Sequence, residues 1–144
     1  MKLPDVNVLL YAVDEASPRF PVARPWVEGL IGGSETVALT WSVLLAFVRL
    51  TTKRQIVAEP FTVEEALDVV DGWLGRPNVV VIHPTDRHSS VLRELLTPLG
   101  TGGNLTSDAH LAALAIEHGA ELCSSDADFS RFTGLRWFDP LRET

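Results

Sequence analysis

Cysteine is almost absent from this chain of 144 residues, with Cys123 as its one representative. A single thiol cannot form an internal disulfide, which excludes the disulfide framework of small secreted domains. Cys123 lies in an apolar segment that is typical of a strand, so we expect a buried, unreactive thiol. No apolar run is long enough to cross a bilayer, and the N-terminus lacks the features of a signal peptide. These absences favour a cytoplasmic protein with no membrane partner.

Several recognisable motifs are also missing. The sequence has no glycine-rich dinucleotide fingerprint and no phosphate-binding loop with its lysine. Its histidines do not follow the spacing of a zinc site with Cys123, so we expect structural or surface roles for them. The histidines are His83, His88, His110 and His118. From Gln55 onward there is no lysine at all, which counts against a phosphatase or a phosphoryl-accepting receiver domain, because both need a lysine at the cleft.

Basic residues are outnumbered by acidic ones. The chain has 12 Lys and Arg against 19 Asp and Glu, for a net charge of −7. Nonspecific nucleic-acid binding usually needs a basic face, so this balance argues mildly against it. Bound cations would reverse the charge locally wherever carboxylates form a metal site. An acidic total also suits a basic protein partner, so the net charge leaves nucleic-acid binding open.

The hydrophobic pattern alternates short strands with helices. Strands are expected at residues 2–5, 36–39, 79–82, 122–124 and 136–138. Helices are expected at residues 6–13, 21–31, 41–52, 62–74, 86–96 and 107–118. Strands separated by helices predict a mostly parallel sheet with both faces covered. The length is that of one α/β domain, spanning residues 1–144.

Three local features sharpen this outline. Residues 79–82 are three valines and an isoleucine, which is typical of a strand buried on both faces. Thr62 and Glu65 have the spacing of a capping box, which predicts the start of a helix. Pro4 cannot donate to a sheet ladder, so we place it at the end of its strand.

Four aspartates follow predicted strands or open a predicted helix. Asp5 ends the first strand, Asp108 lies at the start of the helix at 107–118, and Asp126 and Asp128 follow the strand at 122–124. Functional groups collect outside the carboxyl ends of the strands in a parallel α/β sheet, so these carboxylates should converge on one cleft. Such a cluster repels itself unless a hard cation neutralises it, and Mg²⁺ and Mn²⁺ prefer oxygen ligands. The sequence therefore predicts metal-assisted chemistry, with phosphates as the expected substrates.

Each of these aspartates also has an ordinary structural role open to it. Asp5 could cap the helix that follows it, and Asp108 lies where the helix dipole favours a negative charge. The Thr-Ser pair at 106–107 already offers a cap for that helix, which makes a further acid surplus. Asp126 and Asp128 could belong to a solvated turn. The presence of all four together makes the metal role the stronger interpretation.

Three motifs occur in a fixed order along the chain: Asp5-x-Asn7, Thr106-Ser107-Asp108 and Ser124-Ser125-Asp126-x-Asp128-Phe129. With these motifs the whole chain resembles PIN-domain proteins of the VapC type, the toxin half of bacterial toxin–antitoxin pairs. The resemblance implies a three-layer α/β/α fold and a Mg²⁺- or Mn²⁺-dependent ribonuclease. It also implies a homodimer and a small antitoxin partner, whose helix lies in a groove and sends a basic side chain toward the acidic site.

The resemblance assigns a role to each residue of the motifs. Asp5, Asp108 and Asp126 correspond to catalytic, metal-binding acids, and Asp128 assists them as a further ligand. Asn7 would order the acidic cluster through hydrogen bonds, with helix capping as its alternative. Ser124 would bind a carboxylate or a phosphate, with an ordinary surface hydroxyl as the alternative.

A basic group is the candidate contact with the RNA backbone. It consists of Arg49, Lys53 and Arg54, and an ordinary solvated basic face explains these residues equally well. The four tryptophans are expected to pack in the core or at a dimer interface. None of these assignments is specific enough to name the RNA.

The chain departs from the family pattern at one position. The family carries Glu-x-x-Arg on the helix after the second strand, and here Arg49 matches while Ala46 replaces the acid. One carboxylate for metal or water positioning is therefore missing. The alternative hypothesis is a PIN-like module that binds RNA or a partner but cuts weakly or not at all.

Overall fold

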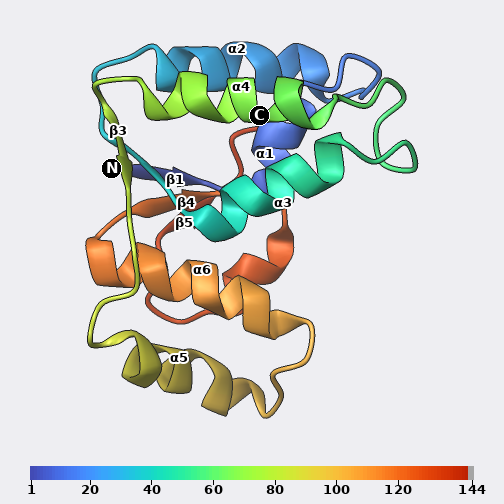
Figure 1. Ribbon diagram of the computed structural model, residues 1–144. Helices are drawn as coiled ribbons and strands as arrows, with labels where there is room; N and C mark the ends of the chain where they lie inside the picture. Colours follow the sequence, from blue (N-terminus) through green and yellow to red (C-terminus); the bar gives the residue numbers. More distant parts are fainter. Residues whose placement is uncertain (143–144) are drawn as a thin grey trace.

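The computed structural model describes residues 1–142 and arranges them in three layers (Figure 1). The strands are β1 (Lys2–Pro4), β2 (Val37–Leu39), β3 (Val79–Val81), β4 (Glu121–Cys123) and β5 (Trp137–Phe138). The helices are α1 (Val6–Tyr11), α2 (Phe20–Ile31), α3 (Trp41–Thr51), α4 (Val63–Leu74), α5 (His88–Leu96) and α6 (Leu105–His118), with 3-10 turns η1 (Thr97–Leu99) and η2 (Ala127–Arg131). In Figure 1, α2 and α4 lie above the sheet and α5 and α6 lie below it. The α/β/α fold class is confirmed.

The sheet places β1 at its centre. Its strand order is β3-β2-β1-β4-β5, and every pair of neighbouring strands among the described residues is parallel. The sequence predicted a mostly parallel sheet, and the observed sheet is parallel throughout. The chain moves outward from β1 to β2 and β3, and then returns to the other side of β1 for β4 and β5. Such a reversal of strand order is where α/β folds place their sites, at the carboxyl edge.

The strand β3 corrects one prediction. Residues 79–82 were expected to form a strand buried on both faces, but β3 is an edge strand that ends at Val81. Val80 is 41% exposed, although it sits in the most apolar run of that segment. An edge strand has one neighbour instead of two, and apolar composition does not reveal the position of a strand in the sheet.

The core lies around the three inner strands. Leu3, Val37, Leu39 and Leu122 are all fully buried. The rings of Phe47 on α3 and Trp73 on α4 pack against each other with their centroids 4.7 Å apart, which joins the two helices. Trp41 is 46% exposed on α3, so of the two places expected for the tryptophans, the core and a dimer interface, it does not occupy the core.

Two predictions about particular residues are confirmed, the capping box of α4 and the burial of Cys123. Thr62 and Glu65 form the complete capping box of α4, with each side chain bonded to the other residue's backbone N–H. Cys123 is fully buried at the end of β4, and burial raises the pKa of its thiol to about 12. The thiol is therefore a packing group and not a nucleophile at neutral pH.

The start of α6 differs from its prediction. The helix begins at Leu105 instead of Ser107, and its N-cap residue is Asn104, whose side chain makes no capping bond. The expected cap from the Thr-Ser pair at 106–107 is therefore wrong, because both residues already lie inside the first turn. Elsewhere, no helix in residues 1–142 is both long and apolar enough to cross a membrane.

The contrast between inner and edge strands gives a direct test of this fold. Val37→Ala removes buried methyl groups from β2, so we expect a loss of about 2 kcal/mol in the free energy of unfolding. The same change at Val80 on β3 should cost less than about 0.7 kcal/mol, since that side chain is already partly in water. Urea denaturation of both variants measures the difference, and equal losses would contradict the assignment of β3 as an edge strand.

Candidate active site at the carboxyl edge of the sheet

The register of β1 and β4 brings Asp5 and Ser124 side by side. Pro4 pairs with Cys123 as the last rung, and the Asp5 backbone N–H donates to the Cys123 carbonyl at 2.9 Å. Asp5 and Ser124 are thus the first residues beyond their strands. They lie at the carboxyl edge, where the order of the strands reverses.

The Ser124 hydroxyl connects the parts of the site. It donates to Oδ2 of Asp5 at 2.8 Å and accepts from Nδ2 of Asn7 at 3.2 Å and from the Asp126 backbone N–H at 3.1 Å. Ser124 is fully buried, which excludes the alternative of a surface hydroxyl. Asn7 also accepts from the Ser125 N–H at 3.4 Å, so its amide links α1 to the loop after β4. Asn7 reaches Asp5 through Ser124.

Asp5 and Asp126 each do structural work as well. Oδ1 of Asp5 accepts from the Val6 N–H at 2.7 Å and caps α1. Oδ1 of Asp126 accepts from the Asp128 N–H at 2.9 Å and caps η2. The capping alternative that the sequence offered for Asp5 is therefore present, and Asp126 caps a 3-10 turn where a solvated turn was the alternative. Each cap holds its carboxylate in one orientation.

Three of the four aspartates form a tight group. Carboxylate oxygens of Asp108, Asp126 and Asp128 lie within 4.8 Å of one another. Asp108 comes from the first turn of α6, and the other two come from η2. Within residues 1–142 no other trio of His, Cys, Asp or Glu side chains has this geometry. Asp5, just beyond β1, is the fourth acid, close enough for its charge to act on Asp108.

The electrostatics of the group show the cost of this convergence. Burial, followed by the charges of Asp126, Asp5 and Asp128, raises the pKa of Asp108 to about 6. Burial also raises the pKa of Asp5, with the Asp126 charge adding to it, while bonds from Ser124 and Val6 oppose the rise. Both shifts mean that the ionised carboxylates are held in an environment that disfavours them.

A divalent cation fits this donor set. The ligands are carboxylate oxygens from two separate elements, the donor type that Mg²⁺ and Mn²⁺ prefer. A cation would also relieve the repulsion that raises the pKa of Asp108. No nitrogen or sulfur donor takes part in this group, so the set does not favour zinc.

The helix α3 contains no Asp or Glu. Ala46 is half-buried on α3, and the neighbouring Arg49 is exposed. Lys53 and Arg54 follow the helix and are also exposed. Within the described part of the chain, these three basic side chains form no ion pair with an acid.

The histidines form structural contacts beside the site. His88 on α5 lies between the carboxylate of Glu117 and Nδ1 of His110, with its Nε2 2.9 Å from the latter. Thr85 donates to the buried Glu117 through both its hydroxyl and its backbone N–H. These bonds tie α5 to α6, the helix that carries Asp108. The sequence did not predict that residues so far apart would share one network.

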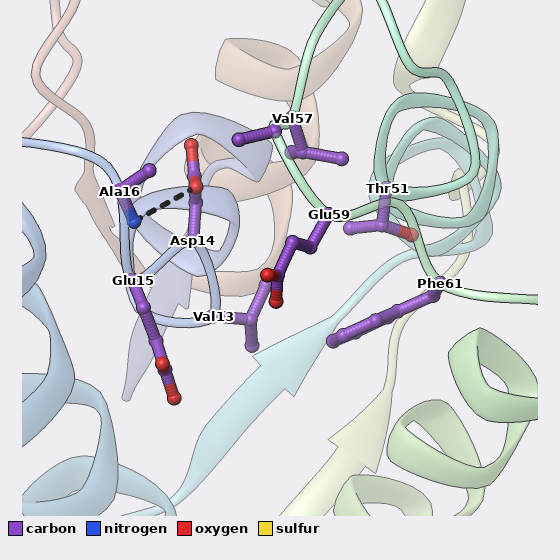
Figure 2. A pocket seen from close by; sticks show the side chains of 9 residues that line it. Val13, Asp14, Glu15, Ala16, Thr51, Val57, Glu59 and Phe61 are labelled. Carbon is purple, nitrogen blue, oxygen red and sulfur yellow. Dashed lines mark hydrogen bonds between the residues drawn. The ribbon is translucent and has the colours of Figure 1, made fainter.

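Two adjoining pockets lie away from the acids, beyond the C-terminal end of α1. The first, of about 380 Å³, has apolar walls that include Val57 and Phe61, and carries the carboxylates of Asp14, Glu15 and Glu59 (Figure 2). The second, of about 440 Å³, runs between α2 and α4. Its walls include the apolar residues Val27, Ile31, Val69 and Trp73 and the charged residues Arg24, Glu28 and Arg76. Val13, Glu15 and Phe61 line both pockets, so the groove between α2 and α4 lies next to a pocket that carries carboxylates.

Comparison with known families agrees with this arrangement. The model of the PIN domain matches residues 2–135, which is nearly the whole chain. The chain belongs to the PIN-domain family. The family resemblance drawn from the three sequence motifs is confirmed.

Curated relatives of this PIN domain span it almost completely. The chain is 47% identical to Ribonuclease VapC37 of Mycobacterium tuberculosis (strain ATCC 25618 / H37Rv) over 140 residues, 97% of each chain. It is 41% identical to Ribonuclease VapC33 of the same strain over 143 residues, 99% of this chain and 100% of the relative. The structure of VapBC2 from Rickettsia felis bound to a DNA fragment from its promoter superposes with a TM-score of 0.70, covering 96% of this chain and 97% of that one at 20% identity. That last likeness supports the fold alone.

Repulsion at Asp108 predicts a measurable effect on stability in the absence of metal. Above pH 6 the wild type must ionise Asp108 in the folded state, so Asp108→Asn should raise the free energy of unfolding at pH 7.5 by about 1 kcal/mol, allowing for partial exposure. The advantage should shrink as the pH falls below 6 and should vanish only below the ordinary aspartate pKa of 3.8, because only there is Asp108 of the wild type protonated in both the folded and the unfolded state. Thermal unfolding in EDTA at several pH values measures it.

The matched control for this test is Asp86→Asn. Asp86 is an exposed aspartate in the loop before α5. It should show no comparable pH-dependent gain. A destabilised Asp108→Asn protein at pH 7.5 would contradict the electrostatic description of the cluster.

Proposed function

We propose that this chain is a metal-dependent endoribonuclease that acts as the toxin of a toxin–antitoxin pair. The observation that carries the proposal is the convergence of Asp5, Asp108, Asp126 and Asp128 at the carboxyl edge of the sheet, with the pKa of Asp108 raised to about 6. Family membership and relatives named as ribonucleases at 47% and 41% identity support the same activity. An RNA substrate and a buried, unpaired thiol at Cys123 suit the cytoplasm as the site of action.

In this proposal the aspartates hold a Mg²⁺ or Mn²⁺ ion and expose it to the phosphodiester. Asp108, Asp126 and Asp128 supply converging oxygens, and Asp5 adds its carboxylate from β1. A bound divalent cation lowers the pKa of a coordinated water and offsets charge on the transition state and leaving oxygen. Ser124 holds Asp5 in one orientation, and Asn7 holds Ser124. The protein's contribution is the fixed placement of these charges.

Asp128 has a particular importance because Ala46 replaces the family glutamate. The acids that remain come from β1, α6 and η2, and α3 contributes none. Asp128 is exposed and lies within reach of Asp108 and Asp126, so it supplies a carboxylate on the open side of the group. We propose that these four acids suffice for activity.

The basic residues at the end of α3 and just beyond it would bind the RNA backbone. Arg49, Lys53 and Arg54 are exposed and form no ion pair among residues 1–142, in a chain whose net charge is −7. Their charges are thus free to interact with phosphates. A cation at the acidic site would reduce its repulsion of RNA, so it should add to the RNA binding that the basic residues provide on their own.

The antitoxin would lie in the groove between α2 and α4. Its apolar trough suits one face of an amphipathic helix, a common mode of peptide recognition. The family resemblance sends a basic side chain of the partner to the aspartate group at the carboxyl edge. Asp14, Glu15 and Glu59 in the adjoining pocket would offer further acidic contacts (Figure 2). We also propose a homodimer, for which exposed Trp41 and Leu45 on α3 provide apolar surface.

A second candidate function follows from Ala46. Without the family glutamate, the domain could bind RNA or its partner without cutting. Cleavage assays on the purified chain separate the two. Metal-dependent cleavage supports the nuclease, and RNA binding without turnover supports the binding module.

The decisive experiment compares RNA cleavage by the wild type and by Asp5→Asn in Mn²⁺, in Mg²⁺ and in EDTA. Asparagine still caps α1, so the fold should survive while a charged ligand is lost. We expect cleavage to fall at least about a hundredfold in the variant and to vanish in EDTA. Asp86→Asn is the control and should cleave like the wild type. Equal cleavage by Asp5→Asn, or cleavage that persists in EDTA, would remove the basis for the proposed site.

Removing basic residues should weaken RNA binding separately from metal binding. In EDTA, which prevents cleavage, the double variant Arg49→Gln/Lys53→Gln should bind single-stranded RNA about threefold to tenfold more weakly. The slope of log K against log salt should also become shallower by about 0.7 for each lost phosphate contact. Arg93→Gln on the exposed face of α5 is the control. An unchanged salt slope would show that these residues do not contact the backbone.

A further inference from the structure

The indole of Trp137 makes an unusual contact with the active-site strand. Its Nε1–H donates to the backbone carbonyl of Ser124 at 2.9 Å. Trp137 lies on β5, and Ser124 is the first residue beyond β4. Neither the sequence pattern nor the family motifs pointed to this bond.

The parallel ladder explains why the indole is needed there. The Cys123 carbonyl accepts from Asp5 on β1, so the next carbonyl, that of Ser124, faces β5. The Ser124 N–H donates to the Phe138 carbonyl at 3.1 Å. If the parallel ladder continued, the Ser124 carbonyl would accept from the N–H of residue 140. Residue 140 is Pro140, which has no N–H to give. The indole of Trp137 supplies the donor that the backbone lacks.

This bond acts on the residue that organises the acidic site. Ser124 is fully buried, so an unpaired carbonyl there would be costly and its peptide would be free to tilt. The hydroxyl of the same residue bonds Asp5, Asn7 and the Asp126 N–H. Tilting the Ser124 peptide would therefore move three partners at once.

We propose that Trp137 is a positioning residue for the metal site, acting through the Ser124 peptide. The inference rests on the proposed function, since it assumes that the acidic group binds a divalent cation. Within residues 1–142, the hydrogen bond of the Trp137 side chain goes to the Ser124 carbonyl and not to an aspartate carboxylate. It fixes the peptide whose side chain orients Asp5 and anchors the start of the Asp126 loop.

The test measures Mn²⁺ binding by calorimetry on the full chain without RNA. Trp137→Phe keeps an aromatic ring and removes the N–H. Loss of a group that directly supports a metal ligand typically weakens metal affinity about tenfold or more. Trp137 acts on Ser124, which in turn supports Asp5, so we expect a smaller effect, with the Kd for Mn²⁺ raised about threefold to tenfold. The same variant without metal should show faster exchange of the Asp126 amide proton by NMR, because that N–H bonds Ser124.

Two further variants separate the hydrogen bond from general packing. Trp26→Phe is the matched control, because Trp26 packs edge-on against Phe138 of the same strand with ring centroids 6.2 Å apart. It should bind Mn²⁺ like the wild type. Pro140→Ala restores a backbone N–H at the missing rung, so the double variant Trp137→Phe/Pro140→Ala should recover most of the lost affinity.

The outcomes distinguish this inference from the proposed function. A Trp137→Phe protein that binds Mn²⁺ and exchanges the Asp126 amide like the wild type would overturn the positioning role. Equal weakening in Trp26→Phe, or no recovery in the double variant, would overturn it too, by assigning the effect to ring packing. Failure of the wild type to bind Mn²⁺ would instead count against the nuclease proposal. The amide exchange of the metal-free proteins would still decide the role of Trp137.

Discussion

A buried hydroxyl, that of Ser124, connects parts of the acidic site that would otherwise be independent. Asp5 comes from the first strand, Asn7 from the helix after it, and Asp126 from a loop more than a hundred residues later. The serine can join them because the register of β1 and β4 puts Asp5 and Ser124 at the same level. Without that register, the carboxylates would still lie at the sheet edge but would have no fixed relation to one another.

The fold keeps these carboxylates together although burial and their mutual repulsion disfavour their charged forms. Burial and neighbouring charges raise the pKa of both Asp108 and Asp5, so the ionised carboxylates are held in an environment that disfavours their charge. Rigid neighbours prevent the carboxylates from moving apart. Helix caps fix Asp5 and Asp126, and the Glu117–His88–His110 network ties α6, which carries Asp108, to α5. Strain at a site and its support by the surrounding structure are expected where function requires a preorganised charge.

Acidic, basic and apolar surfaces lie on different parts of the molecule. The acidic group occupies the carboxyl edge of the sheet, and exposed basic residues lie at the end of α3. The apolar groove between α2 and α4 opens elsewhere and lies next to a pocket that carries carboxylates. A net charge of −7 therefore says little about what the protein binds, since the sign of the charge changes from one surface to the next.

Much of the fold and site could be predicted from local chemistry in the sequence. Alternating strands and helices indicated the parallel sheet, the Thr62–Glu65 spacing indicated the start of α4, and the order of the aspartate motifs indicated the family. Caps, periodicity and motif spacing depend on neighbours in the sequence, so the sequence alone determined them. Whether a strand is internal or at an edge depends on distant partners, and the valines of β3 were misjudged for that reason. The start of α6 was misplaced because its cap residue, Asn104, makes no side-chain bond that a motif could reveal.

Only the tertiary structure could decide the contacts between distant residues. The meeting of Glu117 with His88, and of Trp137 with Ser124, depends on how helices and strands pack and not on spacing along the chain. Pro140 was a visible signal, but its meaning required the register that leaves the Ser124 carbonyl without a backbone donor. The residue types of the site were thus determined by the sequence. Their distances, pKa values and supporting hydrogen bonds were decided by folding, because these depend on burial and on partners that only the folded sheet brings together.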